Sequence, residues 1–239
     1  MTSTNINSLG VAAARNNAEW CATVSRTHGT PGTFGEAAWT SARRTPPYYP
    51  DAVTLRPDAV PADILPGIDT ASPGCSVKDS FGTLDLSSDG FVELFDAAWI
   101  HRPAGIPVAP TTGLRTEWVV SAGRLRDWQA AWHGDGETPD IFRPELLDDP
   151  SVRVVAVLDG ARFAGGAVLN HSAGLVGISN VFAVDHSDVA AVWAGALTAA
   201  GEHFPGLPAV GYEQGDDLTP ALDNGFATLG PLRIWLHSS

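Results

Sequence analysis

Apolar and polar positions alternate most regularly after residue 114. Residues 152–184 contain three strand-like segments, "VRVVAVLDG", "ARFAGGAVLN" and "GLVGISNVFAV", and the first two meet at Asp159-Gly160, a dipeptide typical of tight hairpins. Around them the pattern predicts strands at 116–122, 208–214 and 233–237, helices at 123–134, 188–204 and 218–226, and the start of a helix at 142–151. A central antiparallel meander with helices before and after it predicts an α+β fold.

The first 115 residues have a less regular pattern, broken by proline and glycine. They predict a helix at 16–29, a strand at 52–55, helical turns at 60–69, one or two strands at 75–86 and an amphipathic helix at 89–100. The segment 102–113, "RPAGIPVAPTTG", contains three prolines and is the best candidate for a linker. We therefore expect an N-terminal subdomain over 1–110 and a second domain over 116–239.

Composition adds a charge argument. The 239 residues are 44% hydrophobic and 17% charged, which is typical of a compact fold, and the formal net charge is −13. Residues 116–239 hold 16 of the acidic side chains and only 6 of the basic ones. Because phosphate binding needs a basic surface, nucleic acid is disfavoured as the main partner.

Cysteine and histidine spacing predicts no metal site. Cys21 and Cys75 form no CxxC pair, and the seven histidines show no spacing that would bring two ligands to one metal. The N-terminus lacks the features of a signal peptide, and no run of about 18 apolar residues occurs. We expect a protein of the reducing cytoplasm without a membrane span.

The stretch "GLVGISNVFAV" places Ser179 and Asn180 in the middle of an otherwise apolar strand. A buried hydroxyl or amide without a partner costs about 1–3 kcal/mol, so either the fold or a ligand must supply partners. Both explanations stay open at the level of sequence.

From about Thr116 to His237 the chain resembles the GCN5-related N-acetyltransferase (GNAT) superfamily. The resemblance rests on the hairpin and third strand of 152–184, on the Ala-rich "AAVWAGALTAA", and on "ALDNGFATLGPLRIWL", which is similar to the family's "Y..LGF...G" ending. It implies a mixed, mostly antiparallel sheet flanked by helices, with an N-terminal α/β extension. It also implies an enzyme that moves an acyl group from acetyl-CoA or another acyl-CoA to the amine of a small molecule.

In that fold the strand equivalent to 175–184 splays away from the next strand, here 209–214, and its backbone receives the pantetheine arm of acyl-CoA. The resemblance therefore places Ser179 and Asn180 beside the acyl group and the substrate. It also assigns donor binding to Val181, Phe182, Ala183 and Val184.

The family's pyrophosphate loop, Q/R-x-x-G-x-G/A, is where this chain departs from the pattern. Alignment of the helices puts Asp188 at the basic position, Ala191 at the first glycine and Trp193 at the second. Ala191 and Trp193 are the implied donor contacts, but the acidic residue opposes a pyrophosphate. A packed core helix that begins at an aspartate cap explains the same residues.

Catalysis in this superfamily needs a base for the amine and an acid for the leaving thiolate. The tyrosine of the family ending falls at Ala221, so Tyr212 is the nearest substitute for the acid, and Glu213 or Glu117 is the candidate base. A half-buried strand tyrosine and solvated carboxylates are the structural alternatives.

The segment "SARRTPPYYP" is the one local cluster of basic and aromatic residues. Arg43 and Arg44 are candidates to bind a CoA phosphate or an acidic substrate, with Tyr48 and Tyr49 lining the pocket. A solvated arginine pair on a proline-rich loop is the alternative.

Three functions fit these observations. The first is the acyltransferase. The second is a degenerate GNAT-fold binding or regulatory protein without turnover, because the donor loop is altered. The third is an acyltransferase with a donor other than CoA. The sequence leaves the acceptor, the acyl group and the oligomeric state open.

Overall fold

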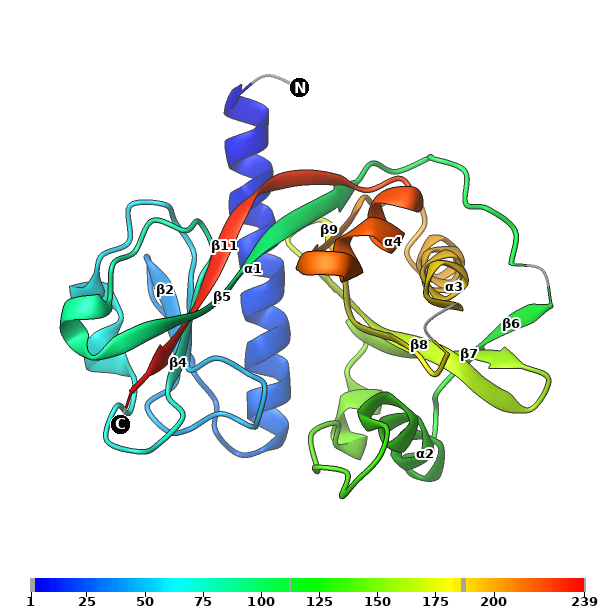
Figure 1. Cartoon of the computed structure of the whole chain (residues 1–239), viewed down its shortest axis with the longest axis horizontal. Helices are drawn as coiled ribbons and strands as arrows, with labels where there is room; N and C mark the ends of the chain where they lie inside the picture. The colour runs from blue at the N-terminus through cyan, green and yellow to red at the C-terminus, as the bar shows by residue number, and fades with distance from the viewer. Residues whose placement is uncertain (1–2, 112, 186–187, 239) are drawn as a thin grey trace. The chain divides into compact units, whose positions relative to one another are not determined.

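The computed structural model describes residues 3–111, 113–185 and 188–238, and the chain divides into two compact units (Figure 1). Unit 1 contains Met1–Trp99 and Leu229–Ser239, and unit 2 contains Ile100–Thr228. The predicted boundary at 110–116 therefore falls inside unit 2, and the last strand belongs to the first unit. Independent folding of the two parts stays a prediction.

Unit 1 packs one long helix against a small mixed sheet. The helix α1 (Ser3–Thr27) buries Ala14, Ala18, Cys21 and Val24, whose spacing places them on one face. The sheet order is β1-β2-β3-β4-β11, with β3 parallel to β4 and the other pairs antiparallel. These strands are β1 (Thr33–Phe34), β2 (Ala38–Thr40), β3 (Ala52–Thr54), β4 (Ser76–Asp79) and β11 (Ala227–His237).

The short elements of unit 1 agree with the expected helical turns. Residues 60–69 contain the 3-10 helices η1 (Pro61–Asp63) and η2 (Leu65–Gly67), each with a proline in its first turn. A third, η3 (Ser87–Asp89), ends at Gly90, whose φ of 84° suits glycine.

The amphipathic helix predicted at 89–100 is wrong, because these residues form the strand β5 (Phe91–Arg102). Five of the first ten residues of that strand are aromatic or β-branched, types that favour an extended backbone. Within unit 1, Arg233 of β11 bonds the carboxylates of Glu93 and Asp96 on β5. The apolar residues of this segment fit the helical and the strand period almost equally well, and pairing with β11 makes it a strand.

Unit 2 contains the predicted meander. The strands β6 (Leu114–Trp118), β7 (Val152–Asp159), β8 (Arg162–Ser172) and β9 (Leu175–Ala183) are consecutive antiparallel neighbours, and β10 (Ala209–Glu213) lies parallel to β9. Asp159 pairs with Arg162 across the turn that contains Gly160, so the predicted hairpin is confirmed.

Helices cover both faces of this sheet. They are α2 (Ala122–His133), α3 (Val189–His203) and the short α4 (Leu218–Asp223), with the 3-10 helices η4 (Pro144–Asp148) and η6 (Gly215–Asp217) between elements. The second helix expected at 142–151 is only the 3-10 turn η4, since Pro150 follows within two residues of its end. The α+β prediction with a mostly antiparallel sheet flanked by helices is confirmed.

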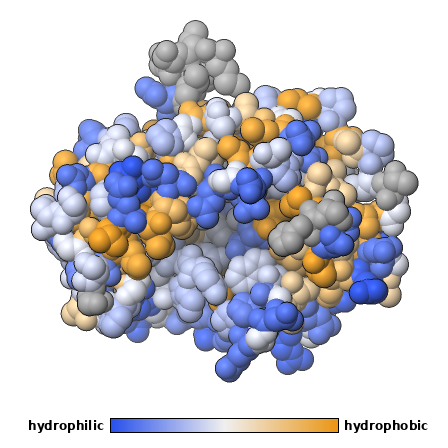
Figure 2. Space-filling model, viewed as in Figure 1, coloured by the Kyte–Doolittle hydropathy of each residue, from blue (hydrophilic) through white to orange (hydrophobic). Residues whose placement is uncertain are grey.

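Buried contacts on each face hold the helices to the sheet of unit 2. On one face, Val192, Trp193 and Ala196 of α3 belong to the same buried cluster as Val176 and Ile178 of β9. On the other face, the fully buried Trp128 of α2 donates from its indole nitrogen to the carbonyl of Val155 at 2.9 Å. Figure 2 shows that side chains over α2 on the viewed face are mostly hydrophilic, as expected for its outward side, where Arg126 and Asp127 are exposed.

Candidate functional site

A bulge in β9 is the first feature of the site. Val168 of β8 pairs with Ser179, but Gly166 pairs with Phe182, so β9 has one extra residue between these pairs. Asn180 lies in that interval with a φ of 52°, in the left-handed region that asparagine tolerates better than most residues.

The bulge changes which residues face α3. Before it, Val176 and Ile178 pack into the cluster under α3, and after it Val181 and Ala183 do. An unbroken strand would have turned Val181 to the other face, because side chains alternate along a strand. The extra residue at Asn180 therefore keeps an apolar surface under α3 along the whole strand.

Beyond the bulge, β9 lacks a neighbour on one side. Its described pairs with β10 are Ala209 with Val176 and Val210 with Gly177, both near the start of β9. On its other side β9 remains paired with β8 as far as Ala183. The two parallel strands have therefore separated at the level of 179–183, as the resemblance implied.

Two polar side-chain atoms are buried at this point without a partner. Ser179 Oγ and Asn180 Oδ1 make no hydrogen bond among the residues that the structure describes. The explanation of 179–180 as polar residues that bond a neighbouring strand thus finds no support for these two atoms. Neither residue is among those that line the cavity beside this half of β9.

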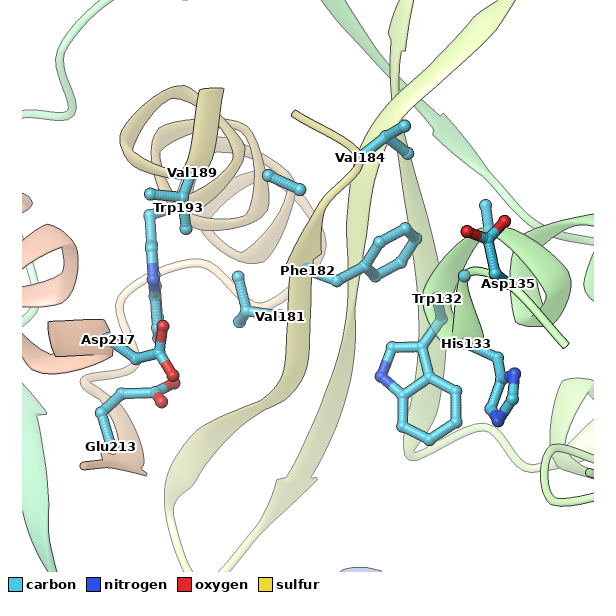
Figure 3. A pocket seen from close by; sticks show the side chains of 13 residues that line it. Trp132, His133, Asp135, Val181, Phe182, Val184, Val189, Trp193, Glu213 and Asp217 are labelled. Atoms are coloured by element: carbon cyan, nitrogen blue, oxygen red, sulfur yellow. The ribbon is translucent and has the colours of Figure 1, made fainter. Parts of the chain in front are cut away.

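A cavity of about 550 Å³ opens beside this half of β9 (Figure 3). Val181, Val189, Trp193, Glu213 and Asp217 lie on one side of the β9 ribbon, and Phe182 points to the other side, toward Trp132. The complete wall consists of Ala131, Trp132, His133, Gly134, Asp135, Val181, Phe182, Ala183, Val184, Val189, Trp193, Glu213 and Asp217.

The charge of this cavity is acidic. Asp135, Glu213 and Asp217 line it, and no lysine or arginine is among its described lining residues. Burial, with a smaller contribution from the negative charge of Asp217, raises the pKa of Glu213 to about 8. A carboxyl group with such a pKa accepts a proton readily near neutral pH, as a general base must.

The start of α3 adds further negative charge. Asp188 is the residue before the helix, and its side chain makes no capping hydrogen bond. Trp193 is buried against Phe226 with ring centroids 5.2 Å apart. The backbone dipole at this helix end favours an anion, whereas the Asp188 carboxylate opposes one.

Comparison with known proteins gives a consistent result for the fold. No family model and no curated protein matches the sequence. A GCN5-related N-acetyltransferase from Kribbella flavida is similar in structure, with a TM-score of 0.60, 15% identity and coverage of 95% of this chain and 96% of that one. A GNAT-family protein from Novosphingobium aromaticivorans gives 0.53 at 10% identity over 92% and 96% of the two chains. A GCN5-related N-acetyltransferase from Sphaerobacter thermophilus gives 0.51 at 11% identity over 70% and 60%.

The chain has the GNAT fold. The first two of these similarities extend over more than nine-tenths of the chain. They therefore include unit 1, for which the sequence resemblance gave no match.

The GNAT fold brings together part of the predicted site. Glu213 and the predicted donor residues Val181, Phe182, Ala183, Val184 and Trp193 all line the cavity. Ser179 and Asn180 lie next to them at the bulge. Ala191 is half-buried on α3 and does not line the cavity. The roles of these residues stay predictions.

The other two catalytic candidates lie elsewhere. Tyr212 precedes Glu213 on β10, so its side chain leaves the opposite face of that strand, and it is not among the cavity residues. Glu117 is on β6, where its carboxylate accepts from Arg115 at 3.0 Å and pairs with Arg124 at 3.3 Å. Glu117 thus serves as the ionic partner of two arginines, and their charges and hydrogen bonds hold the pKa of its carboxyl group below the usual range.

The arginine and tyrosine cluster belongs to unit 1. Arg43 donates to the carbonyl of Gly29, and Arg44 pairs with Asp51 and donates to the carbonyl of Pro73. Tyr49 is buried and Tyr48 is 70% exposed. Both arginines thus have protein partners within their own unit, and their predicted role in substrate binding is still a prediction.

Sequence reasoning missed four polar or aromatic residues of the cavity. Trp132, His133 and Asp135 come from the end of α2, and Asp217 follows Glu213 by four residues in η6. The segment "WHGDG" at the end of a predicted helix was the available signal, because binding and catalytic residues are concentrated in the loops that follow such elements.

Membrane-spanning helices and metal-binding clusters are both absent from the described ranges. None of the helices there is long and apolar enough to cross a membrane. Over the same residues, no group of three His, Cys, Asp or Glu side chains is placed to hold a metal ion.

Proposed function

We propose that unit 2 is an N-acyltransferase that moves an acyl group from acyl-CoA to the amine of a small molecule. The observation that carries the proposal is the position of Glu213. Its proton-accepting carboxyl group lines the cavity beside the half of β9 that has no described partner on the β10 side, in a chain with the GNAT fold.

The shape of β9 supports a donor site. After the two strands separate, the backbone of 179–183 has no described partner on the β10 side, so a peptide-like arm can bond there as a short additional strand. The pantetheine arm of CoA has amide groups suited to this, and acyl-CoA supplies an activated acyl thioester. Val181, Phe182 and Ala183 would hold the arm.

The acidic wall supports an amine acceptor. Asp135 and Asp217 create a negative potential that attracts a cationic amine and disfavours an acidic substrate. Once the amine is bound, Glu213 is placed to take its proton, which leaves the nitrogen lone pair free to attack. The proposal gives this role to Glu213 alone and retains Tyr212 as an untested candidate acid.

The nucleotide end of CoA fits less well. A diphosphate at the start of α3 would meet the Asp188 carboxylate, and the donor-loop pattern has Trp193 in place of a glycine. We therefore expect weak acyl-CoA binding, in which the pantetheine arm supplies most of the affinity.

The same misfit favours a second function, a GNAT-fold binding module without turnover. It predicts that ligands stabilise the protein while no free thiol is released. As for location, the two free, buried cysteines support our proposal of a reducing cytoplasm.

The deciding experiment measures thiol release from acetyl-CoA and from acetyl-pantetheine with a panel of small amines between pH 6 and pH 9.5. If Glu213 is the base, the rate rises with pH through about 8 and then levels, because only the ionised carboxylate accepts a proton. Glu213→Gln should lower kcat/KM by about 10²-fold or more and remove the rise.

Glu202→Gln is the matched control, because Glu202 is exposed near the end of α3 in the same unit. It should keep both the rate and the pH profile. Ligand stabilisation without thiol release would establish the binding module instead. The site assignment is wrong if neither thioester binds, or if Glu213→Gln behaves like the control.

A further inference from the structure

A second cavity, of about 250 Å³, lies within unit 1. It is open to solvent on one side and is lined by one turn of α1 at Gly10 and Val11, by Phe81 after β4, by Trp99 on β5 and by Pro231 on β11. An engineered apolar cavity of about 150 Å³ binds benzene, so the volume here suits one substituted aromatic ring.

The wall of this cavity carries no charge. Asp, Glu, Lys, Arg and His are all absent from its described lining residues. A charged group of a ligand that packs against this wall would therefore gain no ionic partner for the hydration it loses, which is unfavourable. The chemistry selects an uncharged molecule.

One polar atom of the wall is left without a partner. Ser80 lines the cavity, its side chain is 1% exposed, and its Oγ makes no hydrogen bond among the described residues. Two other polar groups of the wall have partners: Thr83 Oγ1 donates to the carbonyl of Pro57 at 2.8 Å, and the indole of Trp99 donates to the carbonyl of Ser80 at 2.7 Å. The remaining polar side chain of the wall, Asn7, is exposed at its rim. A buried, unpartnered hydroxyl in a mainly apolar wall fixes the place of one hydrogen-bonding group of a ligand.

We propose that this cavity is a binding site for a small, uncharged aromatic molecule with one hydroxyl group, which bonds Ser80 Oγ while its ring packs against Phe81 and Trp99. The site is independent of the acyltransferase proposal, because all its residues belong to unit 1.

Gly10 lines the cavity, so a larger side chain at this position can fill it. A Cβ at Gly10 would meet nothing within 4 Å, so a leucine there can extend into the empty space. Gly123 on α2 of unit 2 is the matched control, because its Cβ would also meet nothing within 4 Å.

The test is a titration of the full chain with phenol and with toluene, which has a similar shape but no hydroxyl. Binding is followed by the NMR signal of the Trp99 indole N–H, assigned with Trp99→Phe, while the Trp193 indole reports on the other cavity. We expect phenol to shift the Trp99 signal with a Kd on the order of 1 mM. Gly10→Leu should abolish the shift, and Gly123→Leu should leave it unchanged.

Ser80→Ala separates the hydrogen bond from simple filling of space. It should weaken phenol binding two- to tenfold and leave toluene binding unchanged or tighter, since one neutral hydrogen bond is lost and no unpaired hydroxyl remains. Far-UV circular dichroism confirms that each variant is folded. The proposal is overturned if phenol leaves the Trp99 signal unmoved, if Gly10→Leu still binds phenol, or if Ser80→Ala weakens phenol and toluene equally.

Discussion

The two units use their acidic side chains in different ways. Unit 1 contains 11 acidic and seven basic residues, and its buried acids bond their neighbours. Asp51, 1% exposed, accepts from the backbone N–H groups of Thr45 and Ser76 and pairs with Arg44. Asp79, fully buried, accepts from the backbone of Phe81 and Leu84.

Unit 2 contains 16 acidic residues and seven arginines, and the acids of its cavity are not used in this way. Asp135 and Asp217 are exposed and Glu213 is half-buried, and their carboxyl groups make no hydrogen bond or ion pair to another described residue. Buried acids that maintain a fold are satisfied by it, whereas the more accessible acids of a pocket remain open to a ligand. The contrast gives a criterion for telling structural carboxylates from functional ones.

The largest expected effect tests this criterion in unit 1. Asp51→Ala leaves Arg44 and two backbone N–H groups without their acceptor, so the free energy of unfolding should fall by about 3–5 kcal/mol. Urea melts measure the loss. Asp217→Ala in unit 2 is the comparison and should change stability by less than about 0.5 kcal/mol. Equal losses for the two variants would remove the distinction.

The second expected effect contrasts a tightly packed glycine of unit 2 with one that has open space around it. A Cβ at Gly166 would lie 2.2 Å from the indole nitrogen of Trp128 and 2.6 Å from the carbonyl of Val155, between the two partners of a hydrogen bond. Gly166→Ala should cost about 2–4 kcal/mol, the sum of overpacking and the lost bond. Gly123→Ala, with open space around its Cβ, should leave the free energy of unfolding unchanged or raise it. Urea melts of both variants measure the difference.

The sequence predicted the elements whose pattern is local. The meander, its Asp159-Gly160 turn and the helix at 188–204 follow from periodicity and turn chemistry, and the structure contains all three. The strand β5 was predicted as a helix because its pairing partner is more than 100 residues away in the sequence, at Arg233. Local pattern carries no information about such a partner.

The candidate site shows the same limit. Ser179 and Asn180 stood out as polar residues in an apolar strand, and Glu213 as a carboxylate near them in the resembling fold. The bulge was not predictable, since it depends on the register between β8 and β9. His133 and Asp135 were missed because only the packing of α2 on the sheet brings them to the cavity.

The third expected effect concerns the bulge. Asn180 has a φ of 52° and an unpaired side-chain oxygen, so its side chain contributes tolerance of the left-handed region rather than a bond within the fold. Asn180→Gly should keep stability within about 0.5 kcal/mol, and Asn180→Ala should lose about 1–2 kcal/mol from backbone strain alone. Urea melts with and without acetyl-CoA separate the backbone role of Asn180 from a contact between its amide and the ligand. If the amide contacts the ligand, acetyl-CoA no longer stabilises either variant. A normal ligand response in Asn180→Gly would show that only the backbone matters.

The smallest expected effect is the pH dependence that Glu213 gives to stability. Its pKa is about 8 in the folded chain and near 4.5 in an unfolded one, because burial and Asp217 disfavour the ionised form. Between these values the unfolded chain has released the proton while the folded chain keeps it, so the stability from Glu213 is complete below pH 4.5, falls as pH rises, and levels above 8. The half-buried side chain keeps some contact with water, so we expect the free energy of unfolding to fall by about 1 kcal/mol rather than by the full value of the shift.

Urea melts at pH 5, 7 and 9 should show a shallower decline of the free energy of unfolding for Glu213→Gln than for wild type and Glu202→Gln. Identical declines in all three proteins would mean that Glu213 is ionised in the folded state and is not the group held near pH 8.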